Sequence, residues 1–244
     1  MAYTDIDDPS AYFQATTYTG GGANTEVTNG GNSDLKPDFL WIKNRTAGYA
    51  HFVVDSNRNI SYAQNSSNAP YLETDSTAAE NNNQNWMQSV NTDGFTTGIA
   101  EHTNCNSGSA YVAWQWKANG GTTASNTDGN ITTTVQVNSD AGFSIGTYTG
   151  TGSGSATIGH GLGYVPDLFI IKGRGAPGGA QYWMVGAPNV FGNGTSTVLY
   201  MNENWAASAN TTVWRNAAFT TTTAPMGNHS VINADGGSYV FYAF

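Results

Sequence analysis

The chain has 244 residues, of which 39% are hydrophobic, 12% are aromatic and only 10% are charged. Seventeen acidic residues against eight basic ones leave a formal net charge of -9, which repels a phosphate backbone and argues against nucleic acid as a partner. The polar residues are mainly Asn, Thr, Ser and Gly, which favour turns and half-exposed strands and exclude a long helical bundle. The aromatic content excludes a disordered chain.

The amino terminus carries Asp5, Asp7 and Asp8 where a secretory signal has basic residues followed by an apolar stretch. We therefore expect a chain made in the cytoplasm, or one already trimmed, with these carboxylates in a flexible, solvated arm. The longest apolar runs, at 39–42 and 168–171, are far shorter than the roughly 20 residues of a membrane-spanning helix. No membrane insertion is expected.

Strands are predicted from continuous apolar blocks and from alternation with a period of two. The blocks at 38–43 and 167–172, each closed by a lysine, are typical of central strands. Alternation over 131–137 that continues at 143–145 predicts a hairpin with one buried face. The apolar carboxyl terminus at 239–244 predicts a docked strand, because such a segment is not stable as a free tail.

Helical structure is expected to be scarce. Single helical turns are predicted at 77–80 and at 204–209, and nothing longer is supported. The single cysteine, Cys105, excludes an intrachain disulfide and is expected to be a small buried residue.

The sequence repeats itself with an offset of 128 to 130 residues. The landmarks that recur are Tyr18-Thr19-Gly20 as Tyr148-Thr149-Gly150, Pro37–Lys43 as Pro166–Lys172, Arg45 as Arg174, Tyr71 as Tyr200, Trp86 as Trp214, and Tyr111-Val112 as Tyr239-Val240. Landmarks kept in register over a hundred residues indicate a duplication. We predict an all-β protein of two tandem homologous β-sandwich domains, 1–118 and 130–244, joined by a Gly, Thr and Asn-rich linker at 119–129.

The repeated strings also carry a resemblance. The second unit contains GFSIGTYTGTG, IGHGLG and PDLFIIKGR, and the first contains PDFLWIKNR, DSNR, ETDSTAAE and AYVAWQWKA. Both resemble a β-rich domain that recurs in tail-fibre and other virion proteins of tailed bacteriophages, of a marine phage type. The resemblance implies a virion structural protein and supplies no catalytic residue. No cofactor and no metal centre are expected. The second unit lacks the Asp-Ser-x-Arg and Thr-Ala-Ala-Glu steps of the first.

The sequence contains few candidates for a catalytic, phosphate-binding or metal-binding site. The Gly159–Gly163 run lacks the following helix that a phosphate-binding loop needs, so it predicts a tight turn with His160 as a turn side chain. Glu101, His102 and Cys105 do not complete a tetrahedral zinc site. No Gly-x-Ser-x-Gly elbow or nucleophile and base pair is present, so no catalytic site is predicted.

The tryptophans divide into two groups. Five lie on or beside repeated strands and are predicted to be core residues: Trp41, Trp86, Trp114, Trp116 and Trp214. Trp183 and Trp205 are flanked by Gly-rich or Asn-rich segments and are the candidates for exposed, ligand-binding aromatic residues.

The expected function is therefore association. We expect a non-enzymatic virion component, such as a capsid decoration protein, a fibre-like protein or a tail part, that is made in the host bacterial cytoplasm and binds copies of itself and other virion proteins. The alternative is a carbohydrate-binding module or adhesin that recognises host surface glycans, and a glycan hydrolase is a third, weaker alternative.

Overall fold

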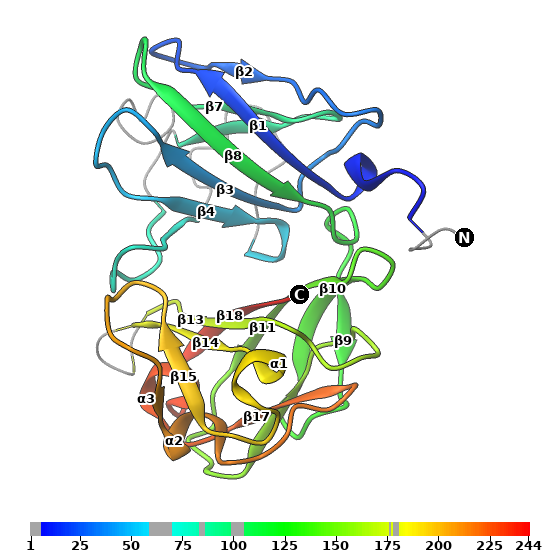
Figure 1. The fold of residues 1–244 in the computed structure, drawn as a ribbon, viewed down its shortest axis with the longest axis vertical. Helices are drawn as coiled ribbons and strands as arrows, with labels where there is room; N and C mark the ends of the chain where they lie inside the picture. The colour runs from blue at the N-terminus through cyan, green and yellow to red at the C-terminus, as the bar shows by residue number, and fades with distance from the viewer. Residues whose placement is uncertain (1–5, 59–69, 83–85, 99–104, 176, 178–180) are drawn as a thin grey trace. The chain divides into compact units, whose positions relative to one another are not determined.

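A computed structural model describes residues 6–58, 70–82, 86–98, 105–175, 177 and 181–244 of the chain (Figure 1). Its elements are almost all β-strands, and the pairs between neighbouring strands are antiparallel. Two compact units can be separated, one within Met1–Thr74 and Glu80–Gly121 and the other within Asp75–Ala79 and Thr122–Phe244. None of the helices in the described residues is long and apolar enough to cross a membrane.

The first unit is built from a five-stranded sheet and a three-stranded sheet. The larger sheet has the strand order β1 (Phe13–Thr19), β8 (Ala110–Trp116), β3 (Phe39–Asn44), β4 (Phe52–Asp55) and β5 (Leu72–Glu73). The smaller one has the order β2 (Glu26–Val27), β7 (Phe95–Thr97) and β6 (Met87–Val90). Two 3-10 turns, η1 (Pro9–Ala11) and η2 (Ser56–Arg58), complete the unit.

The core of the first unit is formed by the inward side chains of these strands. It includes Leu40, Ile42, Phe52, Tyr111 and Phe95, each 0% exposed. Because side chains alternate along a strand, the residues between them on β3 and β8 lie on the opposite, outer face of the sheet.

The second unit is built on an eight-stranded sheet. Its order is β16 (Ser208–Ala209), β15 (Thr197–Tyr200), β14 (Trp183–Gly186), β13 (Phe169–Gly173), β18 (Ser238–Ala243), β11 (Phe143–Thr149), β10 (Thr133–Asn138) and β9 (Ala124–Asn126). A two-stranded sheet, β12 (Ala156–Gly159) with β17 (Thr223–Met226), and three short helices, α1 (Pro188–Phe191), α2 (Thr211–Trp214) and α3 (Ser230–Asn233), complete it. The core contains residues of both sheets and of α2 and α3.

The two large sheets share one strand order. The sequence β1, β8, β3, β4, β5 in the first unit is matched by β11, β18, β13, β14, β15 in the second. Tyr18 lies opposite Tyr111 with the rings stacked at 5.1 Å, and Tyr148 lies opposite Tyr239 with the rings stacked at 5.0 Å. The same aromatic pair therefore joins β1 to β8 in the first unit and their counterparts β11 and β18 in the second.

The loops that follow these tyrosines are bonded alike. The backbone N–H of Gly20 donates to the carbonyl of Ser109 at 2.9 Å, and that of Gly150 donates to Gly237 at 2.8 Å. The hydroxyl of Tyr111 accepts from a backbone N–H five residues before it, and the hydroxyl of Tyr239 does the same. The residues that make these bonds in the second unit are numbered 128 or 130 higher than the equivalent residues of the first unit. These differences are offsets of the sequence repeat.

Several strand predictions are confirmed. β3 and β13 are central strands that pair on both sides, β10 and β11 form the expected hairpin, and the carboxyl-terminal strand β18 is docked between β11 and β13. Trp86 and Trp214 pack in or against the two cores, as predicted. Cys105 is fully buried and forms no disulfide.

Other local predictions are wrong. Residues 77–80 form no helical turn, and the segment 204–209 ends in β16, with the helix α2 beginning only at Thr211. Tyr200 lies opposite Met184, whereas the residue in that position of β5 is Glu73, opposite Phe52. The match of Tyr71 to Tyr200 is therefore two residues out of register. A strand, β9, also lies inside the segment 119–129.

Candidate functional site

The outer face of the five-stranded sheet carries a row of aromatic side chains. We call this set the aromatic face; it comprises Phe13, Phe39, Trp41, Trp114 and Trp116. The three tryptophans are half-buried, Phe13 on the edge strand β1 is 39% exposed, and Phe39 on the central strand β3 is buried. Large apolar side chains that lie together outside the core of their own unit are typical of an interaction surface.

The rings of the aromatic face contact one another across the strands. Trp116 of β8 lies 4.6 Å from Phe13 of β1 and 5.2 Å from Phe39 of β3, measured between ring centroids. In the next row Trp41 and Trp114 meet edge to face at 5.7 Å. Cross-strand aromatic pairs hold each other in one orientation, so the face is rigid and preorganised.

One polar group of this face is unused. The indole N–H of Trp41 is buried and has no hydrogen-bond partner among the described residues. A buried donor without an acceptor is costly, on the order of 1–3 kcal/mol. The aromatic face can therefore supply apolar area to a partner, while the buried indole N–H of Trp41 stays unsatisfied inside it.

The prediction that Trp41, Trp114 and Trp116 are core residues is wrong. None of the three belongs to the buried cluster of the first unit, whose members on the same strands are Leu40, Ile42, Tyr111 and Ala113. The apolar block at 38–43 has large side chains at consecutive positions, so the sequence pattern does not tell the core face from the outer face.

A second aromatic cluster lies in the other unit. Trp205, which follows β15, is 50% exposed, and its ring lies 5.1 Å from Tyr200 and 5.5 Å from Tyr182. Glu203, two residues before Trp205, donates its backbone N–H to the carbonyl of Tyr200 at 3.1 Å, and its half-buried side chain accepts a hydrogen bond from Asn202 Nδ2 at 3.2 Å. An exposed indole beside carboxylate and amide groups is a surface on which a sugar ring can stack and hydrogen-bond.

Trp183, the other candidate for an exposed tryptophan, does not lie in a loop. It is the first residue of β14, is 1% exposed and stacks on Tyr242 at 6.4 Å, while Lys172 Nζ lies 5.6 Å from the centre of its ring. The expectation of exposure is wrong because the Gly-rich segment before Trp183 ends where the strand begins. It offers no surface to a ligand.

The remaining polar candidates have structural partners. His160 is fully buried after β12, where its Nδ1 accepts from Leu162 N at 3.3 Å, and burial lowers its pKa. His160 thus bonds locally to the segment that follows it, in which Gly161 and Gly163 have the positive φ of 77° and 85° that a tight turn requires. Asp8 does not lie in a solvated arm, because it caps η1 and accepts from Ser33 Oγ at 2.6 Å.

No cluster of three or more His, Cys, Asp or Glu side chains that could hold a metal occurs in the part of the chain that the structure describes. Glu101 and His102 lie outside the described residues. Asp5, of the amino-terminal acidic group, also lies outside them.

Two short motifs of the first unit, Asp-Ser-x-Arg and Thr-Ala-Ala-Glu, form one ion-pair network. Arg58 Nε lies 2.5 Å from Asp55 Oδ2, and Arg58 Nη1 lies 2.9 Å from Glu80 Oε2. The side chains of Asp55 and Arg58 are both 0% exposed. A single guanidinium therefore holds the Asp-Ser-x-Arg and Thr-Ala-Ala-Glu motifs together, which indicates a structural role for these side chains.

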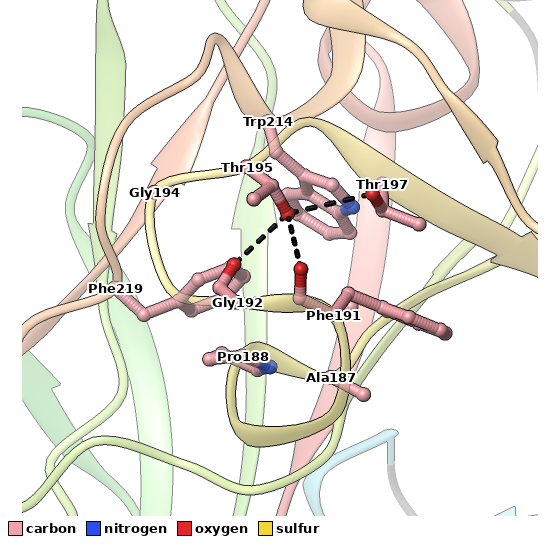
Figure 2. A pocket seen from close by; sticks show the side chains of 10 residues that line it. Ala187, Pro188, Phe191, Gly192, Gly194, Thr195, Thr197, Trp214 and Phe219 are labelled. Carbon is pink, nitrogen blue, oxygen red and sulfur yellow. Dashed lines mark hydrogen bonds between the residues drawn. The ribbon is translucent and has the colours of Figure 1, made fainter.

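One hollow of the second unit is too small for a ligand. Figure 2 shows this pocket, which is lined by α1 and the loop after it, with Trp214 and Phe219 against them. The Thr195 hydroxyl oxygen lies 2.9 Å from the carbonyl oxygen of Gly192. The open volume of ≈ 10 Å³ accommodates about one water molecule.

No curated protein and no solved structure matches the chain. One family matches residues 8–244, which include both large sheets and the aromatic face. The chain therefore belongs to the family described as "Domain of unknown function (DUF7483)".

Proposed function

We propose that this chain is a non-enzymatic structural protein of a tailed-bacteriophage virion, and that it acts by associating with copies of itself and with other virion proteins. The observation that carries the proposal is the aromatic face, a partly exposed apolar surface of rings in mutual contact, outside the core of its own unit. The resemblance of both units to virion domains supplies the location. No nucleic acid or membrane is needed as a partner.

The proposal includes the architecture of two tandem homologous β-sandwich domains, with a linker near 119–129. Support comes from the shared order of five strands, the two stacked tyrosine pairs and the equivalent bonds of Gly20 and Gly150. Duplication followed by divergence accounts for these matches and for the ion-pair network that only the first unit carries.

The location is tested on particles. Antibodies raised against the purified chain are applied to tailed-phage particles whose genome encodes it, and gold labelling is read by electron microscopy. We expect labelling at regular positions on the particle. Particles that contain no such chain by mass spectrometry would refute the proposal.

The role of the aromatic face is tested by Trp114→Ser, with Trp205→Ser as the matched control. Truncating a central interface tryptophan costs on the order of 2 kcal/mol or more, so we expect about 30-fold weaker rebinding to particles stripped of the protein. Trp205→Ser changes an equally large side chain elsewhere and is expected to rebind normally. Circular dichroism verifies that both variants are folded.

A second candidate function is recognition of host surface glycans, and the half-exposed Trp205 favours it. In this test Trp205→Ser is the variant expected to lose binding, and Trp114→Ser is its control. If the cluster of Tyr182, Tyr200 and Trp205 binds sugar, Trp205→Ser abolishes binding on a glycan array and Trp114→Ser does not. An array without any bound glycan would rule this candidate out.

A further inference from the structure

The outer edge of β1 has no strand beside it in the part of the chain that the structure describes. The carbonyl of Tyr12 accepts from Lys117 N, and Gly20 N donates to Ser109 O, so the even-numbered residues between them bond to β8. The N–H and C=O groups of Ala15 and Thr17 therefore point away from the sheet. β1 contains no charge and no proline, the devices that usually protect such an edge.

A groove runs along this edge. It has an open volume of ≈ 510 Å³ and is lined by Ser10, Gln14–Thr17, Thr28, Gly30 and Gly31, none of which is charged. Gln14 ties the two walls together, because its Oε1 accepts from Gly31 N at 2.9 Å and its Nε2 donates to Ser33 O at 2.9 Å. The groove is therefore held open by the fold.

The second unit fills the corresponding place with a strand of its own. β10 lies beside β11, the counterpart of β1, with Thr134 opposite Thr147. β10 also reaches the second wall, since Thr133 Oγ1 donates to Gly159 O at 2.8 Å and Val135 is buried in the core. At the repeat offset of 130, Thr147 and Gly159 correspond to Thr17, which lines the groove of the first unit, and to Asn29, which lies between the lining residues Thr28 and Gly30.

We propose that the groove of the first unit binds an extended segment of another polypeptide, which pairs with β1 as an added antiparallel strand. The inference rests on the proposed association function for the origin of the partner. Pairing through backbone groups gives affinity, and the alternate side chains that enter the groove give specificity. β10 indicates the partner's chemistry: an uncharged segment with β-branched residues at alternate positions.

A separate extended segment fits better than the edge of a second copy. In the second unit, Ile131 N donates to Thr157 O and the following residues pair with β11, so one short stretch is bonded to both walls. A strand that is already part of another sandwich has its inward side chains in its own core and cannot enter a groove in this way. The partner is therefore a chain segment that is free to extend.

The test uses the full chain and a labelled synthetic peptide with the sequence of residues 130–138, NITTTVQVN, as the probe. We expect saturable binding by fluorescence anisotropy. Thr17→Pro removes an outward N–H and is expected to weaken binding about tenfold or more, whereas Thr17→Val, which keeps the N–H, is expected to bind normally.

A second variant covers the case in which Thr17→Pro fails to fold. A side chain at Gly30 meets no atom of the chain within 4 Å at its Cβ, so Gly30→Phe fills the groove from its wall and should abolish binding. Absence of saturable binding, or binding that neither variant weakens, would overturn the inference. A dimer of the chain alone that Thr17→Pro dissociates would also overturn it, because the occupant would then be a second copy. The particle-labelling experiment, which tests the proposed function, does not depend on peptide binding. Failure of the groove proposal and failure of the proposed function can therefore be told apart.

Discussion

Gly20 and Gly150 occupy matching positions in the two units. The change in the free energy of unfolding when each is replaced by alanine therefore tests the proposed equivalence of the units. A Cβ added to Gly20 would lie 2.3 Å from the carbonyl oxygen of Asn106, and one added to Gly150 would lie 2.3 Å from that of Ala234. Both contacts are with backbone, which has to retreat by about 1 Å to reach the 3.4 Å of an ordinary contact. The alanine variants therefore strain the same loop in each unit.

The magnitude follows from the bonds that this loop makes. Gly20 donates to Ser109 O and accepts from Gly108 N, and Gly150 makes the equivalent pair with Gly237 and Gly236 at 2.8 and 2.9 Å. Two hydrogen bonds at about 1 kcal/mol each, together with overpacking of about 1 kcal/mol, predict a loss of about 3 kcal/mol for either substitution.

The assay is urea unfolding followed by tryptophan fluorescence. With a slope of about 2–3 kcal/mol per molar urea, the midpoint of the affected transition falls by roughly 1 M. The controls are Gly30→Ala and Gly175→Ala, where an added Cβ meets nothing within 4 Å, so we expect no loss of stability. If Gly150→Ala destabilises the protein while Gly20→Ala behaves like its control, the two loops are not equivalent and the reasoning fails.

Three further predictions concern buried polar groups. Arg58→Met leaves Asp55 buried without its partner and is expected to cost about 3–5 kcal/mol in thermal unfolding, while Arg45→Met at an exposed arginine should be close to neutral. Burial raises the pKa of Tyr148 well above its ordinary value of about 10, so stability should fall as the pH rises above about 10 and the unfolded phenol ionises. An ultraviolet titration in which this phenol ionises before unfolding would contradict that expectation. Burial lowers the pKa of His160, so the unfolded state binds the proton first and stability should fall as the pH drops through about 6.5. A His160→Asn variant whose unfolding free energy has the same pH slope as the parent would show this to be wrong.

The sequence alone determined the β-rich character, the repeat and the central strands. The blocks ending in Lys43 and Lys172 are the middle strands of their sheets, and the apolar carboxyl terminus is docked as β18. These predictions depend on local properties, namely continuous apolar residues, a period of two and turn residues between strands. Such signals do not require knowledge of what packs on each face.

The candidate site needed the tertiary structure, because both faces of the central strands are apolar. Only the packing decides that Leu40 enters the core while its neighbour Trp41 faces outward, and that Trp183 is covered while Trp205 is half-exposed. Likewise, the sequence contains Arg58 and Glu80 in separate motifs, and only the fold brings their charges together. The groove beside β1 depends on which strands become neighbours in a sheet, and long-range pairing is not encoded in any local pattern.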